Sequence, residues 1–183
     1  MKVLLVIDMQ NASFNTEYPA YDADGVIDRI NKLSELFRNN NYRVIFIQHD
    51  GSKEGFMNPG SHDWELLSSL AIKSEDLIIP KTANDSFYNT GLKEILQNQN
   101  TDELVITGSA TDFCVDSTVK SALTNEFNVT VISDAHTTQG TSYLTAKQVL
   151  DHYNWVWEQM SGTKSKIKVI DFRNYMKELG SNN

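Results

Sequence analysis

Short apolar runs alternate along the chain with longer stretches in which apolar residues recur every three or four positions. Six runs have the length of buried strands, and they lie at residues 2–7, 44–47, 76–80, 104–106, 128–133 and 167–170. Helical spacing marks residues 27–37, 92–96, 115–123 and 144–157, and a short final helix is expected at 174–183. Strands that alternate with helices predict an α/β protein with a mainly parallel sheet. No repeat or linker interrupts the pattern, so we expect one domain over residues 1–183.

Three of the apolar runs end beside side chains with complementary chemistry. Asp8 follows the first run, Lys81 follows the third, and Cys114 comes shortly after the fourth. The carboxyl ends of parallel strands share one edge of a sheet, and ligands bind at that edge. We therefore expect these three side chains to meet in one crevice. There Asp8 can accept the thiol proton, Lys81 can hold and position Asp8, and Cys114 can attack a carbonyl carbon.

Cys114 itself lies at a strand–helix junction. Thr111 and Asp112 are good N-cap types, so Cys114 is expected in or beside the first turn of the helix that follows. Unpaired backbone N–H groups and the helix dipole at that position favour the thiolate. A lone cysteine is more often a small buried hydrophobe, and the local sequence alone favours that alternative. The positions of Asp8 and Lys81 favour a catalytic cysteine over a buried structural one.

Four stretches of the chain carry a family resemblance. They are residues 6–11 with Phe14, Lys81 with residues 86–87 and 90–92, residues 108–115, and residues 133–138. In this order they resemble the isochorismatase-like cysteine hydrolases, which include nicotinamidases, N-carbamoylsarcosine amidase and ureidoacrylate amidohydrolase. The resemblance covers nearly the whole chain. It implies a three-layer Rossmann-like fold, with a six-stranded mainly parallel sheet flanked by helices, and hydrolysis of a small-molecule C–N bond through a Cys114 thioester.

The resemblance implies further site features. The Ser109–Ala110 peptide occupies the position of a non-proline cis bond in the family, and the N–H groups of Ala110 and Cys114 would form the oxyanion hole. We expect the loops at residues 11–24 and 51–64 to determine specificity. The residues assigned to the substrate pocket are Gln10, Phe14, Trp64 and Phe113, with Tyr143 as a further candidate.

Metal binding is where this sequence departs from its relatives. Nicotinamidases resemble one another in an Asp-x-His pair after the second strand, followed by a further His. Here Asp50 is present, but Ser52 stands at the first His position and only His62 is left downstream. Asp50 and His62 alone do not complete the usual coordination. We therefore predict no metal, no cofactor, and a protein other than a nicotinamidase of the usual kind.

The composition of the chain limits the kinds of molecule that it is expected to bind. The net charge of −8 argues against nucleic acid and anionic membranes, which leaves a small-molecule substrate. Cys114 is the only cysteine, so no internal disulfide can form. No run is long enough to span a membrane, and the five apolar residues before Asp8 are too few for a signal peptide. We expect a cytoplasmic protein that forms a homo-oligomer, either a dimer or a tetramer.

Other functions were weighed against C–N hydrolysis. A haloacid dehalogenase phosphatase needs a second Asp where Gln10 stands, and no Gly-x-Gly-x-x-Gly motif follows a strand. A receiver domain needs an acidic cluster that is absent. Isochorismatases cleave a vinyl ether, which requires no cysteine nucleophile, so Cys114 favours C–N cleavage. Vinyl-ether hydrolysis and a catalytically silent binding protein on the same scaffold stay open as alternatives.

Overall fold

A computed structural model describes residues 1–14, 19–162 and 164–180 of the chain. Six strands pair in parallel in the order β3-β2-β1-β4-β5-β6. The strands are β1 (Lys2–Ile7), β2 (Arg43–His49), β3 (Leu77–Lys81), β4 (Glu103–Ser109), β5 (Asn128–Thr137) and β6 (Ile167–Ile170). The helices are α1 (Ala23–Asn39), α2 (Leu92–Asn98), α3 (Asp116–Thr124), α4 (Ala146–Gln159) and α5 (Phe172–Gly180). None of these helices is long and apolar enough to cross a membrane.

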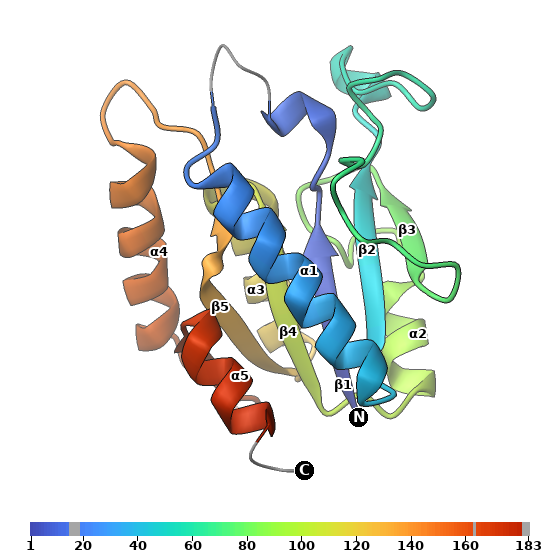
Figure 1. Ribbon diagram of the computed structural model, residues 1–183, viewed down its shortest axis with the longest axis vertical. Coiled ribbons are helices and arrows are strands. Elements are labelled where there is room, and N and C mark those ends of the chain that lie inside the picture. The colour runs from blue at the N-terminus through green and yellow to red at the C-terminus, as the bar shows by residue number, and fades with distance from the viewer. Residues whose placement is uncertain (15–18, 163, 181–183) are drawn as a thin grey trace.

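Helices cover both faces of the sheet and give three layers. Helices α1 and α5 lie on one face, which is toward the viewer in Figure 1, and α2, α3 and α4 pack on the other. Alternate residues of each strand serve opposite faces, so in β1 Leu4 packs under α1 while Leu5 packs toward α3. Helices cover both faces, so the central strands β1 and β4 are buried at every position after the first. The predicted α/β fold with a six-stranded parallel sheet is confirmed.

The structure extends the predicted elements at several ends. Strand β5 continues to Thr137 because, past an irregularity in the ladder, Gly108 and Ser109 pair with His136 and Thr137. Two short 3₁₀ turns, Asn11–Phe14 and Ser52–Glu54, lie in the predicted loops. Parts of the predicted 11–24 loop, including Tyr18, and the end of the predicted last helix lie outside the described residues.

The predicted N-cap of α3 is wrong. A π-helical turn, Thr111–Val115, precedes α3, and the Val115 N–H donates to the Ala110 carbonyl five residues earlier. The N-cap of α3 is therefore Val115, and no side chain caps the helix. The Thr111 hydroxyl instead contacts His136, and Asp112 accepts a hydrogen bond from Thr138. Both polar side chains are used for tertiary contacts, so they are unavailable to the helix end.

The strand order reverses between β1 and β4, which creates the switch point where open α/β sheets bind ligands. The two strands approach closely at this point. Gly108 has a φ of +120°, and a Cβ built on it would lie 2.2 Å from the Ile7 carbonyl oxygen. Only glycine fits there. Asp8, which follows β1, also has a positive φ of 45° and donates its N–H to the Ile47 carbonyl at 3.0 Å.

We predict that Gly108→Ala destabilises the fold by at least about 2 kcal/mol, because a methyl group cannot enter the β1–β4 contact and the backbone conformation is unfavourable for alanine. Urea unfolding would measure the loss. Gly91→Ala is the matched control, because a Cβ at Gly91 meets only the Ile95 Cδ1 at 4.0 Å. Equal stability of the two variants would contradict this account of the switch point.

Candidate active site

The structure brings Asp8, Lys81 and Cys114 together at the carboxyl edge of the sheet. Lys81 ends β3, and its side chain extends past β2 to place Nζ 2.6 Å from Asp8 Oδ2 at the end of β1. The lysine side chain has no exposed surface, and that of Asp8 is 6% exposed. Lys81 Nζ also donates to the carbonyls of Ala83 at 2.8 Å and Asn84 at 3.2 Å. The ammonium is therefore surrounded by acceptors in a buried site.

Burial and the ion pair act on Asp8 in opposite directions. Loss of solvent raises the pKa of the Asp8 carboxyl, and the Lys81 ammonium opposes the rise. Hydrogen bonds to Lys81 and to the Cys114 thiol also favour the carboxylate. A carboxylate with a raised pKa is a stronger base than an exposed aspartate, as general-base chemistry requires.

The Cys114 thiol interacts electrostatically with Asp8 and Lys81. Its Sγ is also 3.7 Å from the Asn84 Oδ1. Burial raises the pKa of Cys114 to about 12, the negative charge of Asp8 adds to the rise, and Lys81 counters it. The expectation that the helix terminus favours the thiolate is therefore wrong. Desolvation and the carboxylate outweigh the partial charge of the helix end, and the resting thiol keeps its proton.

The Ser109–Ala110 peptide is cis, as the resemblance implied. It connects the end of β4 to the π-helical turn that carries Cys114. The Ala110 carbonyl points back into this turn and accepts from the N–H groups of Phe113 and Val115, each at 3.1 Å. The turn is thereby fixed to the end of β4.

A cavity of about 450 Å³ adjoins this peptide. The chain segments that line it are residues 12–13, 56–57, 109–110, 112–113 and 138–141. They come from the loops after β1, β2 and β5, from the end of β4, and from the π-helical turn Thr111–Val115, which we call the nucleophile turn after the proposed role of Cys114. Both loop regions that the sequence assigned to specificity therefore contribute, through residues 12–13 and 56–57. We call this space the substrate cavity.

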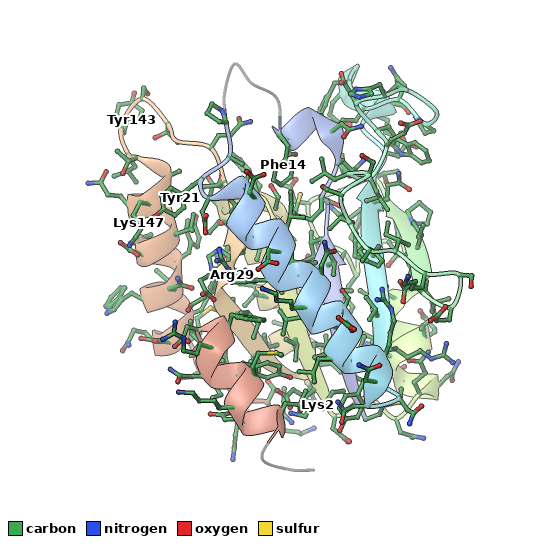
Figure 2. The ribbon with its side chains drawn as sticks, viewed as in Figure 1. Lys2, Phe14, Tyr21, Arg29, Tyr143 and Lys147 are labelled. Atoms are coloured by element: carbon green, nitrogen blue, oxygen red, sulfur yellow. The ribbon has the colours of Figure 1, made fainter. Side chains whose placement is uncertain are left out.

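Of the side chains assigned to the pocket, Phe113 lines the substrate cavity and is 56% exposed. Gln10 is buried, and its amide bridges the His49 backbone, at 2.8 and 3.0 Å, and the Trp64 carbonyl, at 2.7 Å. Phe14 packs against the core under α1, at the carboxyl end of the sheet (Figure 2). In these positions Gln10 and Phe14 stabilise the structure around the site. Their substrate contacts stay predictions.

The two other aromatic candidates differ in exposure. Trp64 is partly buried, and its indole N–H has no partner among the described residues. Tyr143 is 91% exposed, in the loop before α4, and it does not line the substrate cavity (Figure 2).

Sequence reasoning missed two polar residues of this edge. Asn84 contacts Cys114 and Lys81, and its place three residues after Lys81 was the available signal. The other is His49, which ends β2 and lies opposite Lys81 in the sheet register. Burial lowers the pKa of His49 and the Lys81 charge lowers it further, so its imidazole is neutral. Its Nδ1 has no partner among the described residues.

The candidate metal ligands do not form a cluster. Asp50 accepts hydrogen bonds from the backbone N–H of Ser52, at 2.9 Å, and from its hydroxyl. These bonds hold the pKa of Asp50 below its usual range. His62 is 82% exposed and lies beside Asp63, with Nδ1 and Oδ1 3.7 Å apart. No set of three or more His, Cys, Asp or Glu side chains within the described ranges is placed to hold a metal ion.

A buried network supports the nucleophile turn from the side of α4. His136 has no exposed surface, and its ring nitrogens lie 2.9 Å from the Thr111 hydroxyl and 3.0 Å from Asn154 Oδ1. Because Asn154 donates its amide N–H to the Ser133 carbonyl, its oxygen faces His136 and accepts from Nε2. His136 Nδ1 then accepts from Thr111. The His136 ring also lies edge-on to Trp157, with centroids 5.2 Å apart.

Comparison with known proteins identifies the family. The family model described as the isochorismatase domain matches residues 2–161. The chain therefore belongs to the isochorismatase family and is an isochorismatase-family hydrolase.

Named relatives include hydrolases of two kinds. A streptothricin hydrolase of Streptomyces noursei is 30% identical over 75% of this chain, which spans 50% of that protein. The ureidoacrylate amidohydrolase RutB of Agrobacterium fabrum is 27% identical, with 84% of each chain covered. A crystal structure of an isochorismatase family protein superposes with a TM-score of 0.82 at 28% identity, covering 91% of this chain and 96% of that one.

We predict that His136 makes stability fall in acid. Burial lowers the pKa of His136 to about 4. In mild acid the unfolded chain therefore binds a proton at this histidine and the folded chain does not. The contribution is complete above the unfolded pKa of 6.5 and is lost as the pH falls toward about 4, by up to about 3 kcal/mol. Urea unfolding of the wild type and His136→Asn between pH 4.5 and 7.5 measures it. An advantage of the wild type that did not shrink in acid would contradict the prediction.

Proposed function

We propose that this protein is a cysteine hydrolase that cleaves a non-peptide C–N bond of a small molecule, in an amide, carbamoyl or ureide group. The observation that carries the proposal is the placement of the only cysteine beside a buried Asp8–Lys81 pair, with Asn84 contacting both Lys81 Nζ and Cys114 Sγ. Nucleophile, base and cation are the three parts that acyl transfer through a thiol requires. Streptothricin hydrolase and ureidoacrylate amidohydrolase among the relatives support the same class of reaction.

The first half-reaction forms an acyl-enzyme. As Cys114 Sγ attacks the carbonyl carbon, its proton moves to Asp8 and the carbonyl oxygen becomes an oxyanion. The N–H groups of Ala110 and Cys114 are proposed to stabilise that oxyanion. The tetrahedral intermediate then breaks its C–N bond, and Asp8 returns the proton to the leaving nitrogen. The products are a thioester on Cys114 and a free amine or ammonia.

The second half-reaction uses the same groups with water. Asp8 takes a proton from water, the resulting hydroxide attacks the thioester, and the C–S bond breaks. The Cys114 sulfur recovers the proton from Asp8, and the acid product leaves. Lys81 keeps Asp8 in place and offsets its charge throughout. Because the thiol pKa is high, the thiolate forms only as the substrate is attacked, which makes Asp8 indispensable.

The alternatives account for less of the site. A binding-only protein has no use for a buried ion pair. Desolvating the two charges is costly, and such a protein would gain nothing from keeping them. Vinyl-ether hydrolysis has no use for the contact between the Cys114 thiol and Asp8. A metal-free mechanism, a homo-oligomeric assembly and a cytoplasmic location stay predictions.

The proposal predicts ammonia release from at least one member of a panel of small amides, carbamoyl compounds and ureides, in the presence of a metal chelator. Cys114→Ala should abolish this release, because no other thiol is present. Asp8→Asn keeps the side-chain shape and removes the base, so kcat should fall roughly a hundredfold or more. A coupled assay for ammonia gives both kcat and KM.

Two results would contradict the mechanism. One is a folded Cys114→Ala protein that hydrolyses the same compound at the wild-type rate. The other is activity that disappears with chelation and returns on addition of one metal equivalent. Circular dichroism of each variant separates loss of chemistry from loss of fold.

A further inference from the structure

The substrate cavity carries one charge among the side chains that the structure describes. Asp112 is the only charged residue among the described residues that line it. The other described lining residues are neutral polar or apolar, and Phe56, Met57 and Phe113 are its large apolar side chains. Asp112 is the second residue of the nucleophile turn, two positions before Cys114. A molecule that reaches Cys114 through this cavity therefore passes a carboxylate.

The Asp112 carboxylate has no cationic partner within the described parts of the chain. Its Oδ1 accepts from the Thr138 hydroxyl at 2.6 Å, and Thr138 is itself a lining residue. No ammonium, guanidinium or imidazole among the described residues forms an ion pair with it. The Asp112 Oδ2 receives no hydrogen bond from a described residue. One oxygen is thus held in place while the other is left for a ligand.

Three cations at this end of the molecule pair with carboxylates outside the substrate cavity, and Lys53, in the turn before Phe56, is exposed and does not line the cavity. Lys81 is buried against Asp8. Arg29 and Lys147 line a different cavity, between α1 and α4 (Figure 2). There Arg29 binds Asp22, and Lys147 binds Asp151 at 2.5 Å. None of these groups is placed to neutralise a carboxylate of the substrate in the substrate cavity.

We infer that the preferred substrate is cationic, with an ammonium or guanidinium group that binds Asp112 while its C–N bond lies at Cys114. Asp112 is then the residue that determines specificity, and an acyl compound bearing a carboxylate is the disfavoured class. The inference rests on the proposed function, because it names the substrate of that reaction. The Thr138 hydroxyl orients the carboxylate, and the aromatic and thioether surface contacts the rest of the molecule.

A purely structural part for Asp112 is the competing explanation, since an acidic residue near a helix N-terminus is favourable in itself. Asp112→Asn separates the two. It retains an oxygen that can accept from Thr138 and removes the charge. Glu158→Gln is the matched control: Glu158 is exposed near the end of α4, away from the lining of the substrate cavity, and the change removes one negative charge as well.

The test uses three methanethiosulfonate reagents that label Cys114, the single thiol of the chain. One carries a trimethylammonium group, one a sulfonate, and the third is the neutral methyl compound. Second-order labelling rates, each divided by the rate with free cysteine, are measured at low and high salt. The neutral reagent corrects for any change in how readily the thiol ionises.

The wild type should label faster with the cationic reagent than with the anionic one. The charge of Asp112 acts with opposite sign on the two reagents, so about a threefold effect on each gives about a tenfold ratio. Asp112→Asn should lower the ratio about tenfold, Glu158→Gln should leave it unchanged, and salt should compress it in the wild type. An unchanged ratio in Asp112→Asn, or a wild type that prefers the anionic reagent, would overturn the inference.

Labelling needs no substrate, so it fails or succeeds apart from the ammonia assay. An amide panel that releases no ammonia contradicts the proposed function and leaves the charge preference of the cavity intact. Cleavage confined to amides that carry a carboxylate would leave C–N hydrolysis by Cys114 standing and refute the cationic substrate.

Discussion

The site depends on the ion pair between Lys81 and Asp8. Burying two charges costs several kcal/mol per ion, and their attraction offsets that cost only when the geometry is good and the other polar groups are satisfied. Here Lys81 Nζ is 2.6 Å from Asp8 and is also held by two carbonyls of the loop that follows β3. The parallel sheet supplies this geometry, because β1 and β3 end at one edge on either side of β2.

The same pair determines the state of the nucleophile. A thiol beside a carboxylate and out of solvent keeps its proton, even at the start of a helical segment. In the proposed mechanism, proton transfer to Asp8 is then part of the attack on the substrate. The network through His136 and Thr111 holds the turn on which the thiol sits.

Most of the fold could be predicted from local patterns, because each of the six apolar runs forms a strand. The carboxyl ends of parallel strands then lie at one edge of the sheet. Asp8, Lys81 and Cys114 could be assigned to one edge for the same reason. The pKa of Cys114 could not be predicted, because desolvation depends on residues far apart in sequence. The π-helical turn and the place of Asp112 in the lining of the substrate cavity were also missed. Thr138 reaches Asp112 only because β5 runs on to Thr137, past the predicted end at Ser133.

The most direct test of this account is the pH dependence of Cys114 alkylation by iodoacetamide. If burial and Asp8 raise the pKa of Cys114 to about 12, the rate in the wild type should keep climbing through pH 10 without a plateau. Asp8→Asn should shift the curve to lower pH, because it removes a negative charge, and Lys81→Met should not. A wild-type rate that levels off below pH 8 would show a resting thiolate and contradict the account.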